Sequence, residues 1–492
     1  MFRLLQRLLL PVFVLALLIG VLNIKDEFGF DPIDEVEIDD SSSELLTPVF
    51  SLRRAPNLLV SPLANQKLND DLLSLSNMLP TSSCLAVSSN SEELFDYQVD
   101  IPLISGNAQK LITAYAGIQQ IGVNFQYETL IGVVREPESD GLLRTSDLYI
   151  FGSGDPLLRT DAYAAQLPEN YSTIRTSADE LADLTVGMNI LFIQGAVVVD
   201  ESRYDEVRTV PGWSSELKDS AAIGSLSAAL LDGGYEGLKQ GYSSQVGVDN
   251  PPPLLRSPDP VKRFAANFDD LLEARNVVIL KAAKEFSDTD LEDLIEMVSI
   301  KSPTFDLIIK QMLTNNDSIT AEMILKEIGF SRSGQGTTGA GLVALPEILA
   351  VENITNSGML LIDGSGLSPE NQVTCKVLNS VLKNESTKDV FKNALPLAGV
   401  EGVVADQFIG TAFEGNLNAA FSQEENHMSF AGYFTTETGT EITITFISNP
   451  ENESETADKD FSEVLALLSD AISEYTGGQP LDGLGPLLAT EE

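Results

Sequence analysis

The residue types that most often carry enzyme chemistry are scarce in this chain of 492 residues. His427 is its single histidine, and Cys84 and Cys375 are its only cysteines. Zinc sites usually take three or four histidine or cysteine ligands, so the composition excludes them, and we expect no metal ion and no other cofactor. A Ser-His-Asp triad would have to use His427. Its polar neighbours, SQEEN at 422–426, favour an exposed turn instead.

The two cysteines lie far apart in the sequence, and two interpretations of them stay open. In an oxidising compartment the pair Cys84–Cys375 can form a disulfide. Two cysteines at this separation can equally be separate buried thiols. We therefore treat Cys84 and Cys375 as a disulfide candidate.

Residues 1–24 have the form of an export signal. Arg3 and Arg7 precede the apolar run Leu8–Leu22, and Lys25 follows it. No A-x-A cleavage pattern follows the run, so an uncleaved signal anchor and a removed signal peptide are both open. The arginine pair would stay in the cytoplasm and direct the remaining chain outward. We expect a protein exposed on the outer (periplasmic or extracellular) side of the cell membrane, or secreted if the signal is cleaved.

The charge balance excludes two classes of partner. The chain has 30 lysines and arginines against 73 aspartates and glutamates, a net charge of −43. Nucleic-acid binding needs a cationic footprint, and an anionic lipid surface attracts basic rather than acidic proteins. Neither partner suits this chain, and the membrane is reached only through the N-terminal segment.

Hydrophobic periodicity predicts a mixture of helices and strands. The 43% hydrophobic content is ordinary for a globular protein. The expected helices cover Lys110–Ile121, Phe305–Leu313, Ala321–Ile328 and Phe461–Tyr475. The expected strands cover Ser83–Ser88, Leu148–Phe151, Ile190–Val199 and the hairpin Met428–Phe434 with Glu441–Ile447. A late antiparallel hairpin among many helices indicates an α+β fold.

Several short strings, in order along the chain, resemble class C penicillin-binding proteins. These are serine-type D-Ala-D-Ala carboxypeptidases and endopeptidases of peptidoglycan. The resemblance runs from about Val49 to Ser473. Its strings are GSGDP at 152–156, GAVVVDESRY at 195–204, PGW at 211–213, DGSGLS at 363–368 and FAGY at 430–433.

The resemblance implies a β-lactamase/transpeptidase-like core, an antiparallel sheet flanked by helices, with a second domain inserted in it. We expect the core in two parts, 49–151 and 294–475, with the inserted region at 152–293. An acidic, serine-rich linker at 25–48 would join the signal segment to the core. A Gly- and Pro-rich disordered tail would occupy 476–492.

The first catalytic motif of the family is altered in this sequence. Family members place a serine nucleophile three residues before a lysine at the start of a helix, so that both share one face. Here Lys110 is present as the base, but Asn107 stands at the nucleophile position. A carboxamide does not act as an acylation nucleophile, and Asn107 suits a helix N-cap. The alternative is that Ser105 acts with Lys110.

The second motif, S-x-N, is rearranged. Asn316, Asp317 and Ser318 stand where the resemblance places it, so serine and asparagine have exchanged positions. In the family, the serine relays a proton and the asparagine holds the substrate amide. The exchange keeps hydrogen-bonding capacity but changes geometry, and displacements of about 1 Å can cost about 100-fold in rate.

The third motif, K-T-G, belongs to the edge strand that lines the family's cleft. The sequence matches it at Gln407–Thr411, where Phe408 takes the lysine position and Gly410 and Thr411 are retained. A phenyl ring cannot attract the terminal carboxylate of a substrate. This assignment therefore predicts the loss of the anion-binding charge.

Three altered motifs indicate a pseudoenzyme. We expect a cell-envelope homologue of a D-alanyl-D-alanine carboxypeptidase that binds peptidoglycan stem peptides or a cell-wall enzyme. One alternative is an active carboxypeptidase with a non-standard nucleophile such as Ser105. Another is a purely structural protein whose cleft is filled by Phe408.

Overall fold

The computed structural model describes residues 57–89, 92–134, 142–143, 146–219, 223–236, 255–286, 294–424, 427–450 and 461–475. The predicted signal segment, linker and tail lie outside these ranges. In the described ranges, no helix combines the length and the hydropathy needed to cross a bilayer.

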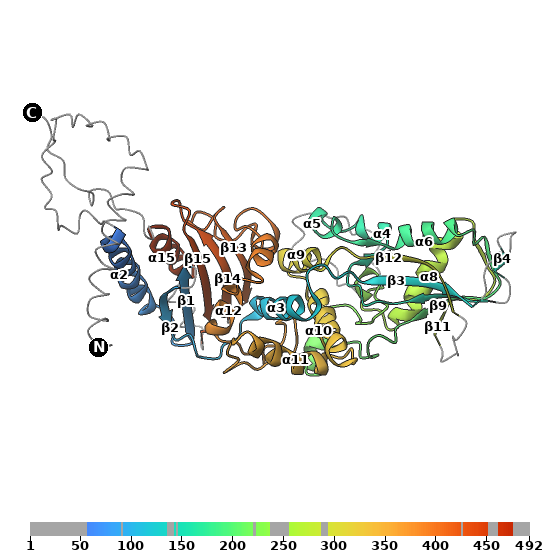
Figure 1. Ribbon diagram of the computed structural model, residues 1–492, viewed down its shortest axis with the longest axis horizontal. Coiled ribbons are helices and arrows are strands. Elements are labelled where there is room, and N and C mark those ends of the chain that lie inside the picture. The colour runs from blue at the N-terminus through green and yellow to red at the C-terminus, as the bar shows by residue number, and fades with distance from the viewer. Residues whose placement is uncertain are drawn as a thin grey trace, which may run out of the picture. The chain divides into compact units, whose positions relative to one another are not determined.

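The first sheet has five antiparallel strands in the order β13-β14-β15-β1-β2 (Figure 1). Their bounds are β1 Ser83–Ser89, β2 Glu92–Tyr97, β13 Leu417–Glu424, β14 His427–Thr435 and β15 Glu441–Ser448. The chain thus returns to this sheet after more than 300 residues. The predicted strand at 83–88 and the predicted hairpin are confirmed.

Side chains alternate between the two faces of this sheet, as strand geometry requires. On β1, Cys84 and Ala86 join the core under one set of helices, and Leu85 and Val87 join the core on the other face. The first face is covered by α3 Lys110–Ile121, α9 Phe305–Asn315, α10 Ser318–Ser333, α11 Thr338–Val351 and α12 Cys375–Leu382. The second is covered by α2 Asn57–Ser76 and α15 Phe461–Ser473 (Figure 1).

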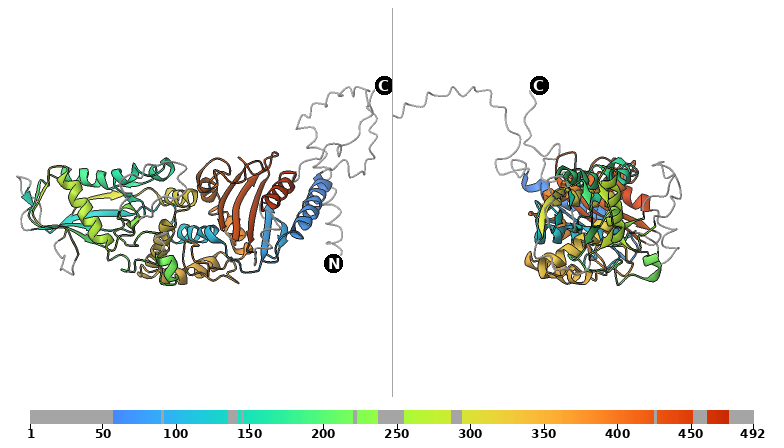
Figure 2. Two further views of the ribbon diagram at one scale, coloured as in Figure 1. Left: turned by 180° about the vertical axis from the view of Figure 1, so that it is seen from behind. Right: turned by 90° about the vertical axis from the view of Figure 1, so that its right-hand side faces the viewer.

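A second five-stranded sheet has the order β11-β9-β5-β3-β12. Its strands are β3 Glu128–Val133, β5 Leu148–Phe151, β9 Val197–Asp200, β11 Lys284–Glu285 and β12 Ile295–Lys301. Helices α6 Ala178–Gly187 and α8 Pro260–Glu273 bury their apolar sides in one core with β3, β5 and β9 (Figure 2). The two sheets with their helices agree with the predicted α+β class and with a second domain within the core.

The remaining elements are short. They are η2 Gly106–Gln109, β4 Leu142–Leu143, β6 Leu158–Arg159, α4 Asp161–Ala164, α5 Glu169–Ser172, β7 Thr176–Ser177, β8 Phe192–Ile193, α7 Ser215–Asp219, η3 Asp232–Gly234, β10 Val278–Ile279, α13 Lys388–Ala394 and η4 Gly402–Val404.

The second sheet takes strands from both sides of the predicted insert. β3 and β5 precede residue 152, and β12 follows residue 293. The domain limits therefore stay a prediction, but the sheet itself spans 128–301.

The single strand predicted over Ile190–Val199 is wrong, because the structure has two strands there, β8 and β9. Gly195 lies between them. A β-carbon on Gly195 would be 2.3 Å from the carbonyl oxygen of Ser146. The chain therefore needs glycine at this close approach, and the extended run is interrupted there.

Cys84 and Cys375 form a disulfide that joins β1 to the first residue of α12. Both residues are fully buried in the core between the first sheet and its helices. Of the two interpretations left open by the sequence, the structure has the bridge.

Candidate active site

Lys110 is positioned by the junction of two helical segments. The 3₁₀ turn η2 leads directly into α3, and Lys110 is the first residue of α3. Gly106 begins this turn with φ of +48°, where a β-carbon would be 2.4 Å from Ser422 Oγ. The turn therefore needs glycine to sit against β13. This close packing fixes Asn107 and Lys110 beside the first sheet.

The Lys110 ammonium donates to three oxygens. Its Nζ lies 3.0 Å from Asn107 Oδ1, 2.6 Å from Asn316 Oδ1 and 2.8 Å from the backbone carbonyl of Ser365. Only 1% of Lys110 is exposed. Among the described residues these acceptors are two carboxamides and a peptide carbonyl, and none is a hydroxyl. The N-cap role predicted for Asn107 is wrong. Ser105 is the residue at the N-cap position of this turn, and the side-chain oxygen of Asn107 accepts from Lys110 instead.

Burial is the main influence on the charge of Lys110. It lowers the pKa to about 8, although the carboxylates of Asp363, Asp317 and Glu322 act in the opposite direction. At neutral pH a minor fraction of this amine is therefore unprotonated. A lysine in this state is chemically able to accept a proton, as the family's mechanism requires.

The rearranged S-x-N motif meets Lys110 at the α9–α10 junction. Asn316 ends α9 with φ of +55°, in the left-handed region that asparagine tolerates. Asp317 is the N-cap of α10, and its Oδ1 accepts from the backbone N–H of Thr320 at 3.1 Å. Ser318 opens α10 and lines a pocket. Asn316 thus occupies the side of the motif that faces the lysine.

The DGSG loop holds the third oxygen in place. Asp363 is fully buried, and its carboxylate accepts from Trp213 Nε1 at 2.7 Å and Asn371 Nδ2 at 2.8 Å. It also accepts from the backbone N–H groups of Gly366 and Ser368, at 2.7 and 2.8 Å. The strings PGW and DGSGLS therefore meet in one hydrogen-bonded network. This network orients the loop beside Lys110.

Glu322 supports the same loop from α10. Its Oε1 accepts from the backbone N–H groups of Gly364 and Ser365 at 3.0 and 2.8 Å. Burial raises the pKa of Glu322 to about 8, and the neighbouring charge of Asp363 adds to the increase. This carboxyl is therefore largely protonated at neutral pH. It contacts the N–H of Ser365, the residue whose carbonyl accepts from Lys110.

A pocket of about 220 Å³ opens beside Asn316 and Ser318. Its other walls include Arg159, Tyr163 and Tyr235, from the part of the chain that contains the second sheet. The Arg159 guanidinium lies 3.9 Å from the carboxylate of Asp317. The described lining therefore combines this cation and its paired carboxylate with phenol, hydroxyl and amide groups, which suits a polar peptide.

The structure does not bring the predicted K-T-G residues to this site. Phe408, Gly410 and Thr411 precede β13, which begins only at Leu417. Phe408 is 6% exposed and packs edge-on against Phe413, Phe421 and Phe430, in the core under α2 and α15. Assigning this segment to the edge strand was wrong, and Phe408 does not fill the cleft. It lies on the opposite face of the sheet from Lys110.

The edge strand beside η2 is β13, with the sequence LNAAFSQE. This strand contains neither lysine nor arginine. Ala420 belongs to the core shared with α3, so its side chain is on the face toward Lys110. The loss of the K-T-G lysine stays a prediction, and the edge strand that faces α3 is β13 rather than the segment at Phe408.

His427 is not the exposed turn residue predicted. It opens β14, is 7% exposed, and its Nε2 lies 3.0 Å from Ser422 Oγ. Burial lowers its pKa below the ordinary value. Sequence analysis missed this pair because it depends on the register of β13 and β14, in which Ser422 and His427 lie on the same face. The pair has no contact with Lys110 in the described network.

Ser105, the alternative nucleophile, is fully buried. Its backbone carbonyl accepts from Ser429 Oγ at 2.6 Å, and its own hydroxyl has no hydrogen-bond partner among the described residues. The contacts of Lys110 do not include it. The structure therefore gives Ser105 no route to activation.

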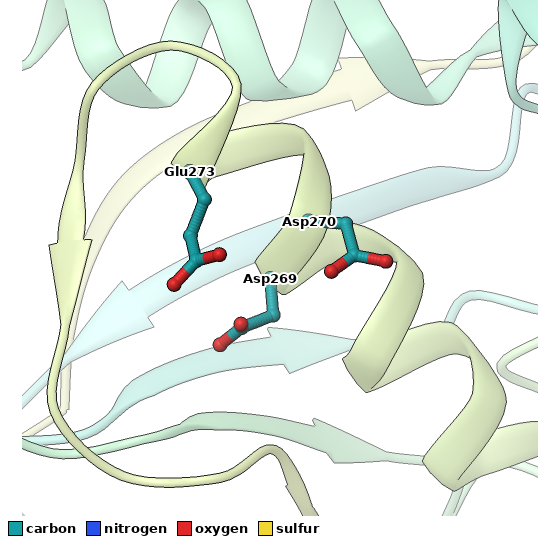
Figure 3. Close-up of side chains that lie close together, drawn as sticks. All are labelled: Asp269, Asp270 and Glu273. Atoms are coloured by element: carbon teal, nitrogen blue, oxygen red, sulfur yellow. The ribbon is translucent and has the colours of Figure 1, made fainter.

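One group of carboxylates in the described ranges is close enough to share a cation. Asp269, Asp270 and Glu273 lie together on α8 (Figure 3). Burial and the other two carboxylates raise the pKa of Asp269 to about 6. The group includes none of the residues around Lys110, and exposed acidic groups like these are common without a bound ion.

Residues 65–245 and 249–471 match the D-Ala-D-Ala carboxypeptidase 3 (S13) family. The chain belongs to the S13 family. It is 24% identical over 460 residues to a D-alanyl-D-alanine carboxypeptidase of Actinomadura sp. (strain R39), covering 80% of this chain and 81% of that protein. It is 25% identical over 371 residues to carboxypeptidase DacB of Mycolicibacterium smegmatis, covering 73% and 74%.

The fold agrees with this assignment. The crystal structure of penicillin-binding protein 4 from Haemophilus influenzae aligns with a TM-score of 0.63 at 18% identity, covering 82% of this chain and 99% of that one. This S13 member therefore has the fold of that structure. The Lys110 amine donates to the carboxamides of Asn107 and Asn316 and to no serine hydroxyl among the described residues.

Proposed function

We propose that this S13 protein is an exported cell-envelope protein that binds peptidoglycan stem peptides without forming an acyl-enzyme. The observation that carries the proposal is the contact set of Lys110, whose acceptors are Asn107, Asn316 and the carbonyl of Ser365. Covalent catalysis by a lysine-activated serine needs a hydroxyl within hydrogen-bond reach of the amine. A carboxamide at 3.0 Å offers none.

Binding is supported by the pocket beside Ser318. Its wall contains Arg159, and β13 contains no cation, so a peptide carboxylate would be attracted to the pocket rather than to the edge strand. Relatives that are named D-alanyl-D-alanine carboxypeptidases act on peptides that end in D-Ala-D-Ala, which supports the choice of ligand class. Export is supported by the N-terminal sequence pattern.

The test is to incubate the purified protein with a stem pentapeptide ending in D-Ala-D-Ala. Calorimetry should detect binding, and an assay for free D-alanine should detect no release. Ser318→Trp should fill the pocket and weaken binding at least ~10-fold. Ser331→Trp, on the exposed end of the same helix, is the matched control and should bind as the wild type does.

Release of D-alanine by the wild type would contradict the loss of catalysis. Unchanged binding by Ser318→Trp would contradict the placement of the peptide in this pocket. The same peptide with its terminal carboxylate amidated separates charge recognition from shape, because it should bind more weakly if Arg159 attracts the carboxylate.

A further inference from the structure

The buried lysine and a distant carboxamide are in contact. Lys110 Nζ lies 2.6 Å from Asn316 Oδ1, and the two residues are 206 positions apart. The lysine is fixed by the start of α3, and the asparagine is fixed by the end of α9 in a left-handed conformation. Neither group has a role in acylation when Asn107 replaces the serine. The contact therefore needs a separate account.

We propose that Lys110 and Asn316 react to form an intramolecular amide bond. The Nζ–Cγ bond forms and the Cγ–Nδ2 bond breaks. Two protons of the Lys110 ammonium pass to the leaving nitrogen, the first being lost from Nζ before attack, and ammonium departs. The charge balances, because one ammonium enters and one leaves. No oxidant, metal or cofactor takes part.

The hydrogen bond makes the two reacting groups neighbours in the fold. Asn316 Cγ is one carbonyl bond, ~1.23 Å, from the oxygen that Lys110 contacts. For attack, the Lys110 side chain has to leave this hydrogen bond and bring Nζ over the face of the carboxamide. Once such neighbours reach an aligned attack geometry, they behave as if at effective concentrations of ~10⁵ M or more. Slow reactions of a carboxamide with an amine then become feasible within the lifetime of a protein.

The surroundings favour a neutral amine. Burial lowers the pKa of Lys110 to about 8 even though Asp363, Asp317 and Glu322 raise it. Glu322 is itself largely neutral near pH 7, because burial raises its pKa to about 8. Arg159, 3.9 Å from Asp317, offsets part of that carboxylate's field. Burial therefore outweighs the carboxylates around Lys110 and leaves part of its amine neutral near pH 7.

Asn316 is the partner rather than Asn107 for two reasons. Its oxygen is nearer to Nζ, at 2.6 Å against 3.0 Å. It also lines the pocket of about 220 Å³, which gives the departing ammonia a path to solvent. The resulting bond would tie the start of α3 to the α9–α10 junction.

Mass spectrometry of the purified full chain tests this directly. After reduction of Cys84–Cys375, the intact mass should be about 17 Da below the value expected from the purified sequence, the loss of one ammonia. Digestion should give a branched peptide that joins Lys110 to Asn316. The fragment distinguishes the cross-link from a succinimide or a cyclised terminus, which lose the same mass.

Lys110→Met and Asn316→Ala should each have the full sequence mass, and Asn107→Ala should keep the loss of about 17 Da. The wild-type protein is also held for about a day near pH 9, where the amine is mostly neutral. If digestion then gives separate, unmodified peptides that contain Lys110 and Asn316, the proposal is wrong. A link from Lys110 to Asn107 would also overturn it. The wild-type fragment decides even if a variant fails to fold. The mass measurement does not depend on peptide binding. The amide bond and the proposed function can therefore fail independently of each other.

Discussion

At the scale of single residues, burial and local acceptors determine what Lys110 and Glu322 can do. Desolvation lowers the pKa of Lys110 to about 8, even though three carboxyl groups near Lys110 raise it. Desolvation has the opposite effect on Glu322, because its charged form is the deprotonated one, and its pKa rises to about 8. The free Lys110 amine and the Glu322 carboxyl therefore both titrate near physiological pH, which is unusual for lysine and glutamate side chains.

Glu322→Gln should change how stability depends on pH. Between about pH 4.5 and 8 the folded protein keeps the Glu322 proton and the unfolded chain loses it, so rising pH lowers the free energy of unfolding. The variant cannot titrate, so denaturant melts from about pH 5 to 8 should show a flatter dependence, by ~1 kcal/mol or more. The exposed Glu370→Gln is the control. Parallel pH profiles for wild type and Glu322→Gln would contradict the raised pKa.

The site was predictable from sequence where its geometry is local. The i,i+3 spacing of Asn107 and Lys110 already placed both side chains together, and their contact at 3.0 Å confirms this. Phe408 was misplaced because an edge strand is defined by its partner, and the register of β13 against β14 cannot be read from a short string. His427 was misjudged for the same reason, since its burial comes from a strand and not from its polar neighbours.

At the scale of elements, the DGSG loop between α11 and α12 organises the site. Asp363 collects donors from Trp213, Asn371 and the loop's own backbone. A buried carboxylate is tolerated only when such donors satisfy it. The loop then presents the Ser365 carbonyl to Lys110.

Asp363→Ala should destabilise the fold strongly, because several buried donors lose their acceptor together. We expect a loss of ~3–5 kcal/mol in the free energy of unfolding, measured by urea denaturation. Asp406→Ala removes an exposed aspartate in another loop and should change stability by less than ~0.5 kcal/mol. Equal effects of the two substitutions would contradict the organising role of Asp363.

The disulfide is a second element-scale constraint. Cys84 and Cys375 are 291 residues apart and join β1 to α12. A cross-link that closes so long a loop typically contributes ~2–5 kcal/mol. Reduction of the disulfide should lower the melting temperature of the wild type. A Cys84→Ser, Cys375→Ser double variant should have a lower melting temperature than the wild type, and reductant should not change it. An unchanged melting curve after complete reduction, checked by thiol titration, would contradict this.

Elements were predictable where periodicity within one segment decides them. α3 has the predicted bounds Lys110–Ile121, and the hairpin β14–β15 lies where the alternating pattern put it. The second sheet was harder to delimit. β3 and β12 pair across about 160 residues, and no local pattern encodes a pairing at that range.

At the scale of the whole molecule, the net charge of −43 is the dominant physical property. Like charges repel across a folded surface, and salt screens this repulsion over a Debye length of ~10 Å at 0.1 M. The melting temperature should therefore rise between ~0.05 and 0.5 M sodium chloride. The same series in sucrose, which adds no ions, separates screening from solvent exclusion. A fall in melting temperature with salt would contradict net self-repulsion.

Family membership describes the whole molecule, but it does not determine the chemistry around Lys110. Matches over 65–245 and 249–471 establish the S13 scaffold, but the reaction depends on a few atoms around Lys110. A scaffold supports many sites, so activity has to be argued from those atoms. Among the described residues, the hydrogen-bond acceptors of Lys110 are two carboxamides and a peptide carbonyl.

Labelling with fluorescent penicillin tests this central claim most directly. The wild type should remain unlabelled, because no serine hydroxyl is paired with Lys110. A variant that combines Asn107→Ser, Asn316→Ser, Ser318→Asn and Ala420→Lys restores a hydroxyl, the relay order and a cation on β13, and it should gain covalent label. The same variant without Asn107→Ser is the matched control and should stay dark. Covalent labelling of the wild-type protein would contradict the account.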